Sequence, residues 1–360
     1  MRASILGLGQ WLAATVRTND HWPAEIVARW SARADDDGID GTIAAVPEGP
    51  ADHLTSAYFA DDALDPFLRS TRRHVDETGI SSCDASALAA RAALEDAGVD
   101  PARVDVVLSA EAVPDRPSSS APKIAELAGA HGARAMTCDA ACASPIVQLE
   151  LACALIESGR ARYVLCVQGH VVTRAFPLAH PALPLLSDTA TAFVVGPSER
   201  SGVLGIAARS DGTAHDAVSW VRGRDASSDT PWWTAGAALM LGSRDRDRAQ
   251  QIMRGTIGMG AGTLREACVQ AQRDPSALAL VTSVQPRRWV AEGIARSLGL
   301  PPDRTVSTFD RIGHVGGCCL VANLLEARRA GVLGRGALVG LYAQGMGFTR
   351  AAAVIEWDAR

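Results

Sequence analysis

The chain has 360 residues and a formal net charge of −5, with 48% hydrophobic and 21% charged residues. This length can supply two domain-sized cores, and the acidic balance argues against a nucleic-acid partner or an anionic membrane surface. No apolar run approaches the ~18 residues that a membrane-spanning helix needs, so we expect a cytoplasmic protein without membrane contact.

The start of the chain and the cysteines argue against a secreted, disulfide-bonded or zinc-binding protein. Residues 1–9 carry one positive charge and are interrupted by glycines, which predicts a first buried strand rather than a secretory signal. The eight cysteines contain no CxxC pair, and several lie in apolar runs. This pattern is typical of reduced, buried thiols rather than of disulfides or a zinc site, so no metal is expected.

Strand-like apolar runs alternate with runs of helical periodicity, which predicts a layered α/β architecture. In the first half, the predicted elements after the opening strand are a helix at 85–96, a strand at 104–110, a helix at 146–156 and strands at 163–168 and 191–196. In the second half, they are a strand at 203–208, a helix at 248–271, a strand at 277–283, a helix at 290–298, a loop feeding a helix at 313–330 and a strand at 336–341. The acidic stretch 34–53, which contains glycine and proline, is expected to form a surface loop or cap.

Cys142 is the strongest candidate for covalent chemistry. It lies in a stretch of small residues, 139–144, immediately before the apolar helical run. A thiol at the start of a helix feels the positive end of the helix dipole, which favours the thiolate, and the thiolate attacks acyl carbonyls. We therefore predict that Cys142 is a nucleophile and that the other seven cysteines are small core residues.

Among the eight histidines, His314 has the most favourable context for catalysis. It lies in a loop of small residues, 313–317, directly before an apolar helix. Flanking glycines let a ligand approach the backbone and leave the imidazole accessible. His170, His180 and His215 lie beside strand ends and turns and are weaker candidates.

A third segment, Gly345-Met346-Gly347, follows the last apolar strand. Glycine-rich turns at strand ends present backbone N–H groups that can stabilise the oxyanion of a tetrahedral acyl intermediate. Taken alone, the segment is more typical of a tight structural turn than of an oxyanion site.

Together these segments resemble the β-ketoacyl-ACP synthase III branch of the thiolase superfamily. The similar segments, in the family's order, are 5–12, 139–144, 185–192, 310–314 and 345–349. The resemblance implies a thiolase-like α/β fold with five layers, α-β-α-β-α, built from two duplicated halves. Residues 1–200 would carry the nucleophile, and residues 201–360 the histidine and the oxyanion loop. It further implies a homodimer that acts on acyl thioesters of CoA or acyl carrier protein, with phosphopantetheine as part of the substrate and no bound cofactor.

One family position is altered. The family has a Cys-His-Asn set; here Val284 lies where its histidine is expected, and His314 occupies the position of its asparagine, where thiolase-type members place a catalytic histidine. Valine donates no hydrogen bond, and loss of an oxyanion donor costs on the order of 10²–10³ in rate, which argues against decarboxylative condensation. We therefore predict an acyltransferase of secondary metabolism that moves an acyl group through acyl-Cys142 to the hydroxyl, amine or thiol of a small-molecule acceptor, with His314 as base. The N–H groups of Cys142 and of the turn, at Met346, are expected to hold the oxyanion.

Other functions stay open from the sequence. The nearest is a condensing enzyme that forms a carbon–carbon bond by a decarboxylative or a thiolase-like route, and another is a non-catalytic partner subunit. A nucleotide-dependent oxidoreductase is disfavoured, because Gly7-Leu8-Gly9 lacks the third glycine of a dinucleotide-binding loop.

Cations are expected where a pantetheine arm and a carrier protein would approach. Arg69 and Arg72 resemble the family's arginine-bearing segment at the tunnel entrance. Arg287 and Arg288 follow the altered position and are expected to meet an acidic carrier protein.

Overall fold

Two β-sheets organise the molecule. The computed structural model describes residues 2–32, 52–199, 202–222 and 239–358. The first sheet has the strand order β1-β7-β6-β4-β5 and the second the order β11-β12-β13-β8. All strands of the first sheet come from residues 2–198, and all strands of the second from residues 202–356. The two predicted halves of the chain therefore each supply one sheet.

The first sheet is mixed. Its strands are β1 (Arg2–Leu12), β4 (Val106–Glu111), β5 (Arg134–Thr137), β6 (Val164–His170) and β7 (Thr189–Ser198). The neighbours β4, β5 and β6 run parallel, whereas β7 runs antiparallel to both β6 and β1. Because β4, β5 and β6 are parallel, their carboxyl ends meet at one edge of the sheet, and loops that leave this edge can converge on one site.

The second sheet repeats the mixed pattern. Its strands are β8 (Gly202–Ser210), β11 (Leu280–Ser283), β12 (Leu338–Gly345) and β13 (Thr349–Glu356). β11 and β12 run parallel, and β13 pairs antiparallel with β12 and with β8. β12 extends four residues beyond the predicted strand 336–341, so its carboxyl end reaches the glycine-rich turn.

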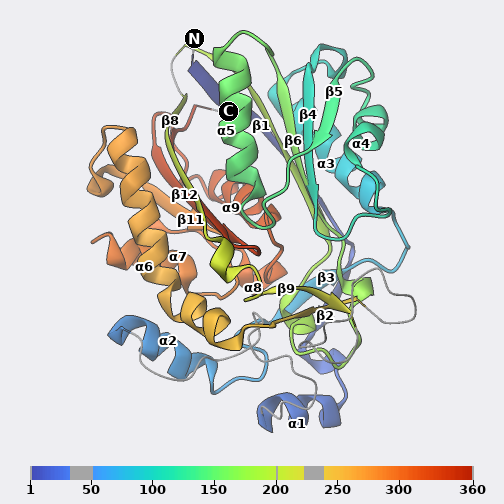
Figure 1. Ribbon diagram of the computed structural model, residues 1–360, viewed down its shortest axis with the longest axis vertical. Helices are drawn as coiled ribbons and strands as arrows, with labels where there is room; N and C mark the ends of the chain where they lie inside the picture. The colour runs from blue at the N-terminus through green and yellow to red at the C-terminus, as the bar shows by residue number, and fades with distance from the viewer. Residues whose placement is uncertain (1, 33–51, 200–201, 223–238, 359–360) are drawn as a thin grey trace.

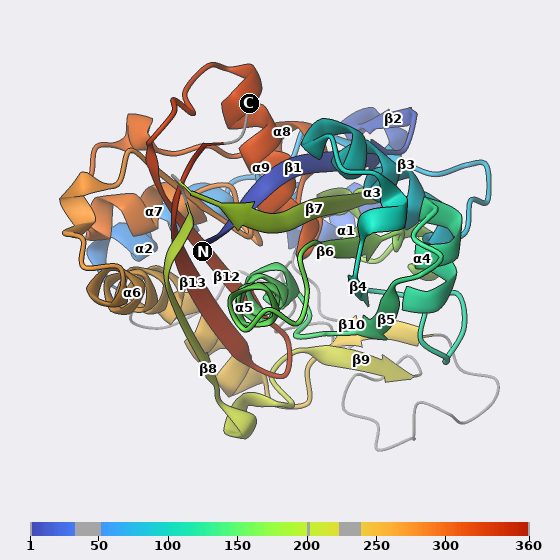
Figure 2. The same cartoon turned by 90° about the horizontal axis from the view of Figure 1, so that it is seen from above.

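The helices complete five layers, which confirms the predicted architecture (Figures 1 and 2). The outer face of the first sheet is covered by α3 (Ser82–Ala97) and α4 (Ala121–Ala128). The central layer, between the two sheets, is formed by α5 (Ser144–Glu157) and α9 (Cys318–Arg329). The outer face of the second sheet is covered by α6 (Arg246–Gln270) and α7 (Val290–Ser297).

The sequence of α5 suits its central place. Side chains of α5 such as Ile146 and Leu149 belong to one buried cluster with Phe193 of the first sheet and Leu341 of the second. A helix that is packed on several sides needs apolar residues around most of its circumference, which explains the nearly unbroken apolar run 146–156. The start of this helix is therefore held firmly in the middle of the molecule.

Smaller elements lie beyond the carboxyl edges of the sheets (Figure 1). They are α1 (Ala24–Ala32), α2 (His53–Asp62), α8 (Phe309–Ile312), the pair β2 (Thr15–Thr18) and β3 (Arg72–Val75), and the pair β9 (Ser219–Arg222) and β10 (Leu239–Gly242). The predicted loop at 34–53 falls almost entirely outside the described residues, and its last residue, His53, begins α2. Within the described ranges, the search for a bilayer-spanning helix finds no candidate of sufficient length and hydropathy.

Candidate active site

A cavity of about 650 Å³ lies beyond the carboxyl ends of β4, β6 and β12. Its lining is mostly apolar and includes the predicted nucleophile, base and oxyanion loop: Cys142, His314, Gly345, Met346 and Gly347. These residues come from both halves of the chain. The structure therefore brings the five residues predicted for catalysis into one site.

Cys142 is presented by a tight turn at the start of α5. Ala141, the preceding residue, has a positive φ of 51°, which is unfavourable for a side chain other than glycine and is found where function requires a strained backbone. The hydroxyl of the buried Ser144 closes the turn, because it accepts a hydrogen bond from the Ala140 N–H (2.8 Å) and donates one to the Ala141 carbonyl (2.6 Å). This turn directs the thiol into the cavity.

His314 is the partner of this thiol. Its Nε2 lies 3.8 Å from Cys142 Sγ, and its Nδ1 lies 3.8 Å from the Sγ of the fully buried Cys319. The His314 N–H donates a hydrogen bond to the Leu185 carbonyl (2.6 Å), and the Gln285 side chain donates one to the Gly313 carbonyl (2.7 Å). These contacts hold the imidazole against the sulfur.

Burial sets the resting charge state of the pair. It raises the pKa of the Cys142 thiol to about 12, with smaller contributions from Cys319 and Asp139. Burial and the neighbouring His170 lower the pKa of His314 to about 3, against an opposing hydrogen bond with the Gln285 backbone. The sequence predicted that the helix dipole would lower the pKa of Cys142. In the structure, burial has the larger effect and raises this pKa instead. With these pKa values the thiol and the imidazole are both neutral near pH 7, and a thiol in this state would need a base in order to attack a carbonyl.

Acid is expected to destabilise the protein through His314. The folded pKa of about 3 lies below the ordinary 6.5, so the unfolded chain binds the proton more readily. The stability from this group is complete above pH 6.5 and falls by about 1.4 kcal/mol for each pH unit below it. Urea unfolding at pH 7 and pH 5 should show a smaller loss for His314→Asn than for the wild type. Equal losses in both proteins would contradict the buried, neutral state of this ring.

The predicted oxyanion loop lies against the nucleophile turn. A Cβ on Gly345 would stand 2.1 Å from the Ala140 carbonyl oxygen and 3.0 Å from the Cys142 nitrogen, so only glycine allows this approach. Met346 and Gly347 follow along the cavity wall. The backbone of this loop is thus beside the place where a thioester carbonyl would meet the sulfur.

Position 284, where the resemblance implies a histidine, carries a buried valine. The valine is 1% exposed and belongs to the central core cluster, and only its backbone N–H makes a hydrogen bond, to the Tyr342 carbonyl (3.0 Å). The next residues carry other roles: the Gln285 side chain supports the His314 loop, and Pro286 lines the cavity. No side chain at 284 can donate to a bound thioester.

His170 is a site residue that the sequence underrated. It is the last residue of β6, lines the cavity, and its ring centroid lies 6.4 Å from that of His314. Burial lowers its pKa. Its position at the carboxyl end of a strand parallel to β4 is the signal that could have raised its rank, because such ends carry functional side chains in α/β sheets.

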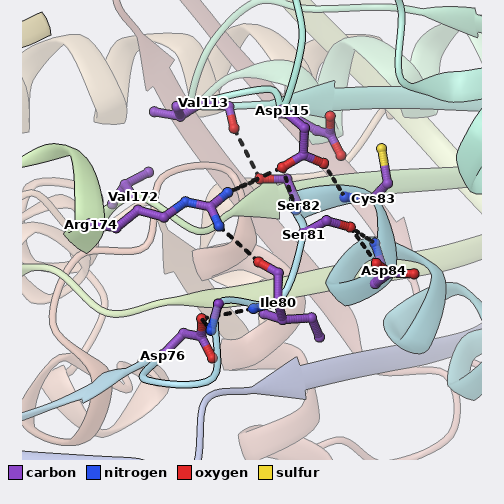
Figure 3. Close-up of polar contacts among 12 residues, drawn as sticks. Asp76, Ile80, Ser81, Ser82, Cys83, Asp84, Val113, Asp115, Val172 and Arg174 are labelled. Carbon is purple, nitrogen blue, oxygen red and sulfur yellow. Dashed lines mark hydrogen bonds and ion pairs between the residues drawn. The ribbon is translucent and has the colours of Figure 1, made fainter.

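The rim segment 112–120 forms another wall of the cavity, and Asp115 anchors it to the start of α3 (Figure 3). The Asp115 carboxylate accepts hydrogen bonds from the Ser82 N–H (2.9 Å) and the Cys83 N–H (3.0 Å) and pairs with Arg174 (3.2 Å). Although partial burial acts the other way, these hydrogen bonds hold the pKa of Asp115 below its ordinary value. The rim is therefore fixed by a carboxylate at the positive end of a helix dipole.

Asp115→Ala is expected to lower the free energy of unfolding by about 1–2 kcal/mol, because the N–H groups at the start of α3 lose their acceptor. Urea unfolding measures this loss. Asp115→Asn keeps one acceptor oxygen and should lose less. An alanine variant as stable as the wild type would show that this anchor contributes nothing.

The four predicted carrier-binding arginines lie outside the cavity lining. Arg69 pairs with Asp61, and Arg288 pairs with Asp310 at 2.9 Å with both side chains about half exposed. Arg72 is exposed and lines a separate hollow next to Arg311. Arg287 corrects the prediction: it is 0% exposed and pairs with the buried Asp62 (3.4 Å), so it offers no surface to a carrier protein.

Comparisons with known proteins match this site and fold. Residues 136–212 match the family model of 3-oxoacyl-[acyl-carrier-protein] synthase III, and residues 268–357 match the model of its C-terminal part. A β-ketoacyl-[acyl-carrier-protein] synthase III of Roseiflexus sp. is 32% identical over 290 residues, covering 80% of this chain and 87% of that protein. The same enzyme of Roseiflexus castenholzii is 30% identical, covering 89% of this chain and 98% of that protein.

Solved structures show the same fold. The synthase III of Pseudomonas aeruginosa superimposes with a TM-score of 0.77 at 22% identity and covers 99% of both chains. A priming β-ketosynthase of a polyketide biosynthetic pathway gives a TM-score of 0.78 at 22% identity, over 99% of this chain and 97% of that one. The predicted thiolase-like fold is confirmed. The chain belongs to the β-ketoacyl-ACP synthase III family of the thiolase superfamily, whose members are condensing acyltransferases.

Proposed function

We propose that this protein takes an acyl group from a CoA or acyl carrier protein thioester onto Cys142 and passes it to an acceptor that is activated by loss of a proton. The observation that carries this proposal is the 3.8 Å approach of His314 Nε2 to Cys142 Sγ inside a mostly apolar cavity. No bound cofactor or metal takes part in the proposed steps. The relatives reported above are β-ketoacyl-[acyl-carrier-protein] synthases, which supports a thioester donor.

The first half-reaction follows from the neutral pair. As Cys142 Sγ attacks the thioester carbonyl, His314 Nε2 takes its proton and then delivers it to the departing thiol. One carbon–sulfur bond forms and one breaks. The N–H groups of Cys142 and Met346 are proposed to hold the oxyanion, since the Gly345–Gly347 turn lies directly against the nucleophile turn.

Two candidate functions differ in the chemical group that accepts the acyl group from Cys142. Carbon–carbon condensation with a second acyl thioester is favoured by the relatives, which are β-ketoacyl synthases and match 80% and 89% of this chain. Transfer to a hydroxyl, amine or thiol of a small molecule in secondary metabolism is favoured by Val284, which removes a donor used in decarboxylation. The evidence from the relatives is stronger, so condensation is the first candidate. In condensation, proton abstraction from the acceptor would replace loss of carbon dioxide; in transfer to a heteroatom, the acceptor loses only its proton.

Intact-protein mass spectrometry tests the shared first step. Wild type incubated with hexanoyl-CoA should gain the mass of one hexanoyl group, and Cys142→Ala should not. Cys138→Ala is the matched control, because this half-buried thiol lies four residues away and outside the cavity lining, and should acylate normally. No mass gain in the wild type with any acyl-CoA or acyl-ACP would overturn the proposal.

Adding acceptors to the acylated protein separates the two candidates. A β-keto product with a second acyl-CoA, without release of carbon dioxide, would support condensation by proton abstraction. An ester or amide with 1-butanol or butylamine, and no β-keto product, would support heteroatom transfer. Rapid carbon dioxide release from malonyl-ACP would contradict the role assigned to Val284.

We also propose that the protein is a homodimer joined at β5. This strand lies at the edge of the first sheet, and its Met136 side chain is 41% exposed. An open strand edge with an exposed apolar side chain is suited to pairing with a second copy. Light scattering should report a dimer that Met136→Glu weakens at least tenfold, whereas Leu64→Glu, at an exposed apolar residue outside the sheets, should not. A monomeric wild type would contradict this proposal.

A further inference from the structure

The cavity holds a second imidazole, His170, that the first half-reaction does not use. His170 is 7% exposed and ends β6, and its ring stands at 74° to that of His314 with 6.4 Å between the centroids. Both rings line the cavity with Cys142. Among the described residues, the cavity lining therefore contains two histidines and two thiols, Cys142 and Cys318.

A backbone carbonyl fixes the tautomer of His170. Its Nδ1 lies 2.9 Å from the Ser187 carbonyl oxygen. A carbonyl only accepts hydrogen bonds, so Nδ1 carries the proton of the neutral ring and Nε2 carries the lone pair. Within the described part of the chain, no hydrogen bond is formed at Nε2. His170 thus faces the site as an acceptor of protons.

Gly316 packs closely against both His170 and Cys142. A Cβ added at Gly316 would stand 2.9 Å from His170 Cδ2, 3.5 Å from His170 Nε2 and 3.7 Å from Cys142 Sγ. Its φ of +55° also favours glycine. Only glycine fits at this position, so its backbone packs closely against both His170 and Cys142, and both side chains line the cavity that an acceptor would enter.

We propose that His170 is a second catalytic base, which takes the proton of the acceptor in the second half-reaction. The inference rests on the proposed function, because it requires an acyl group on Cys142. The acceptor's bond to hydrogen breaks, its electron pair forms the new bond to the acyl carbon, and the acyl–sulfur bond breaks. The proton passes to His170 Nε2 and then returns to the Cys142 thiolate. No co-reactant other than the acceptor is needed.

The different roles proposed for His314 and His170 follow from their positions relative to Cys142. His314 is in contact with the sulfur and serves the thiol, whereas His170 lines the same cavity without a hydrogen bond to the sulfur among the described residues. Because Val284 supplies no imidazole, His170 and His314 are the two imidazoles of the described cavity lining. His170, at the end of β6 in the first half of the chain, provides the base for the acceptor.

Half-reaction kinetics of His170→Gln test the proposal. Protein acylated with hexanoyl-CoA is freed of excess donor, and loss of the hexanoyl group is followed by intact mass with water, ethanol or hydroxylamine as acceptor. Water and ethanol must lose a proton to attack, whereas hydroxylamine attacks as a neutral amine without a base. We expect His170→Gln to lose about 10²–10⁴-fold with water and ethanol. Its acylation rate and its hydroxylamine cleavage should stay within about threefold of the wild type.

Controls separate a base from a structural histidine. His180→Gln removes another buried histidine, 2% exposed and outside the cavity lining, and should leave all rates unchanged. Unchanged ethanolysis in His170→Gln, or an equal loss with hydroxylamine, would overturn the role of His170 while the acyl-enzyme still stands. A wild type that forms no acyl-enzyme would overturn the proposed function and this inference with it.

Discussion

Replacing His314 with alanine is expected to slow acylation of Cys142 by about 10²–10⁴-fold, the usual loss when a positioned base is removed. The thiol has a pKa raised to about 12, so almost none of it is ionised at pH 7 without a base. His314 Nε2 is 3.8 Å from the sulfur, and burial keeps this ring neutral and ready to accept a proton. Stopped-flow detection of CoA released from hexanoyl-CoA measures the rate.

Two variants sharpen this result. His314→Asn places a side chain that donates hydrogen bonds but does not take a proton, so it should acylate as slowly as His314→Ala if proton transfer is the role. Cys319→Ala removes the sulfur at His314 Nδ1 and should have a smaller effect, because the contact to Cys142 remains. Acylation at the wild-type rate in both His314 variants would show that another group activates the thiol.

Gly345→Ala is expected to reduce acylation at least about 10²-fold, the scale of losing one oxyanion donor. The added methyl would overlap the Ala140 carbonyl oxygen at 2.1 Å, so the nucleophile turn or the loop must move. Movement of either separates Cys142 from the backbone donors proposed for the oxyanion. The same hexanoyl-CoA assay measures the change.

A glycine without neighbours provides the matched control. Gly258 lies within α6, and apart from the backbone of its own helix and its two chain neighbours, no described atom lies within 4 Å of a Cβ added there. Gly258→Ala should keep the wild-type rate and increase stability by up to about 1 kcal/mol, because alanine favours a helix. If Gly345→Ala acylates as fast as Gly258→Ala, the close approach at 345 has no catalytic role.

The fold was largely predictable because its elements have strong local patterns. The apolar run 146–156 predicted α5 nearly to its ends, and the strand at 336–341 was predicted but too short, since Gln344 and Gly345 lack strand-like character. Glycine breaks such a pattern, yet here it is required by contact with the Ala140 carbonyl. That contact is between distant parts of the chain and leaves no local pattern in the sequence.

The candidate site was predicted in part. Cys142 and His314 stand in stretches of small residues, which a sequence can reveal, and the structure brings them together. The charge state of Cys142 was predicted in the wrong direction, because the helix-start argument is local while burial depends on the whole fold. Arg287 was placed at a carrier surface for the same reason: its partner Asp62 is more than 200 residues away along the chain.

The local sequence around His170 is not enough to identify it as a residue of the site. Beside a strand end it has the same local features as His180 and His215. Only the pairing of β6 with β4 and the turn of Cys142 bring it to the cavity. Its lone pair depends on the Ser187 carbonyl, which no sequence pattern identifies.

Peptide mapping after incubation with hexanoyl-CoA tests the central claim most directly. The wild-type protein is mixed with excess hexanoyl-CoA, quenched within seconds, digested and analysed by tandem mass spectrometry. The account predicts one hexanoyl group per chain, on Cys142, with release of one equivalent of CoA. Acyl groups on other cysteines alone, or turnover of thioester without any adduct on Cys142, would contradict it.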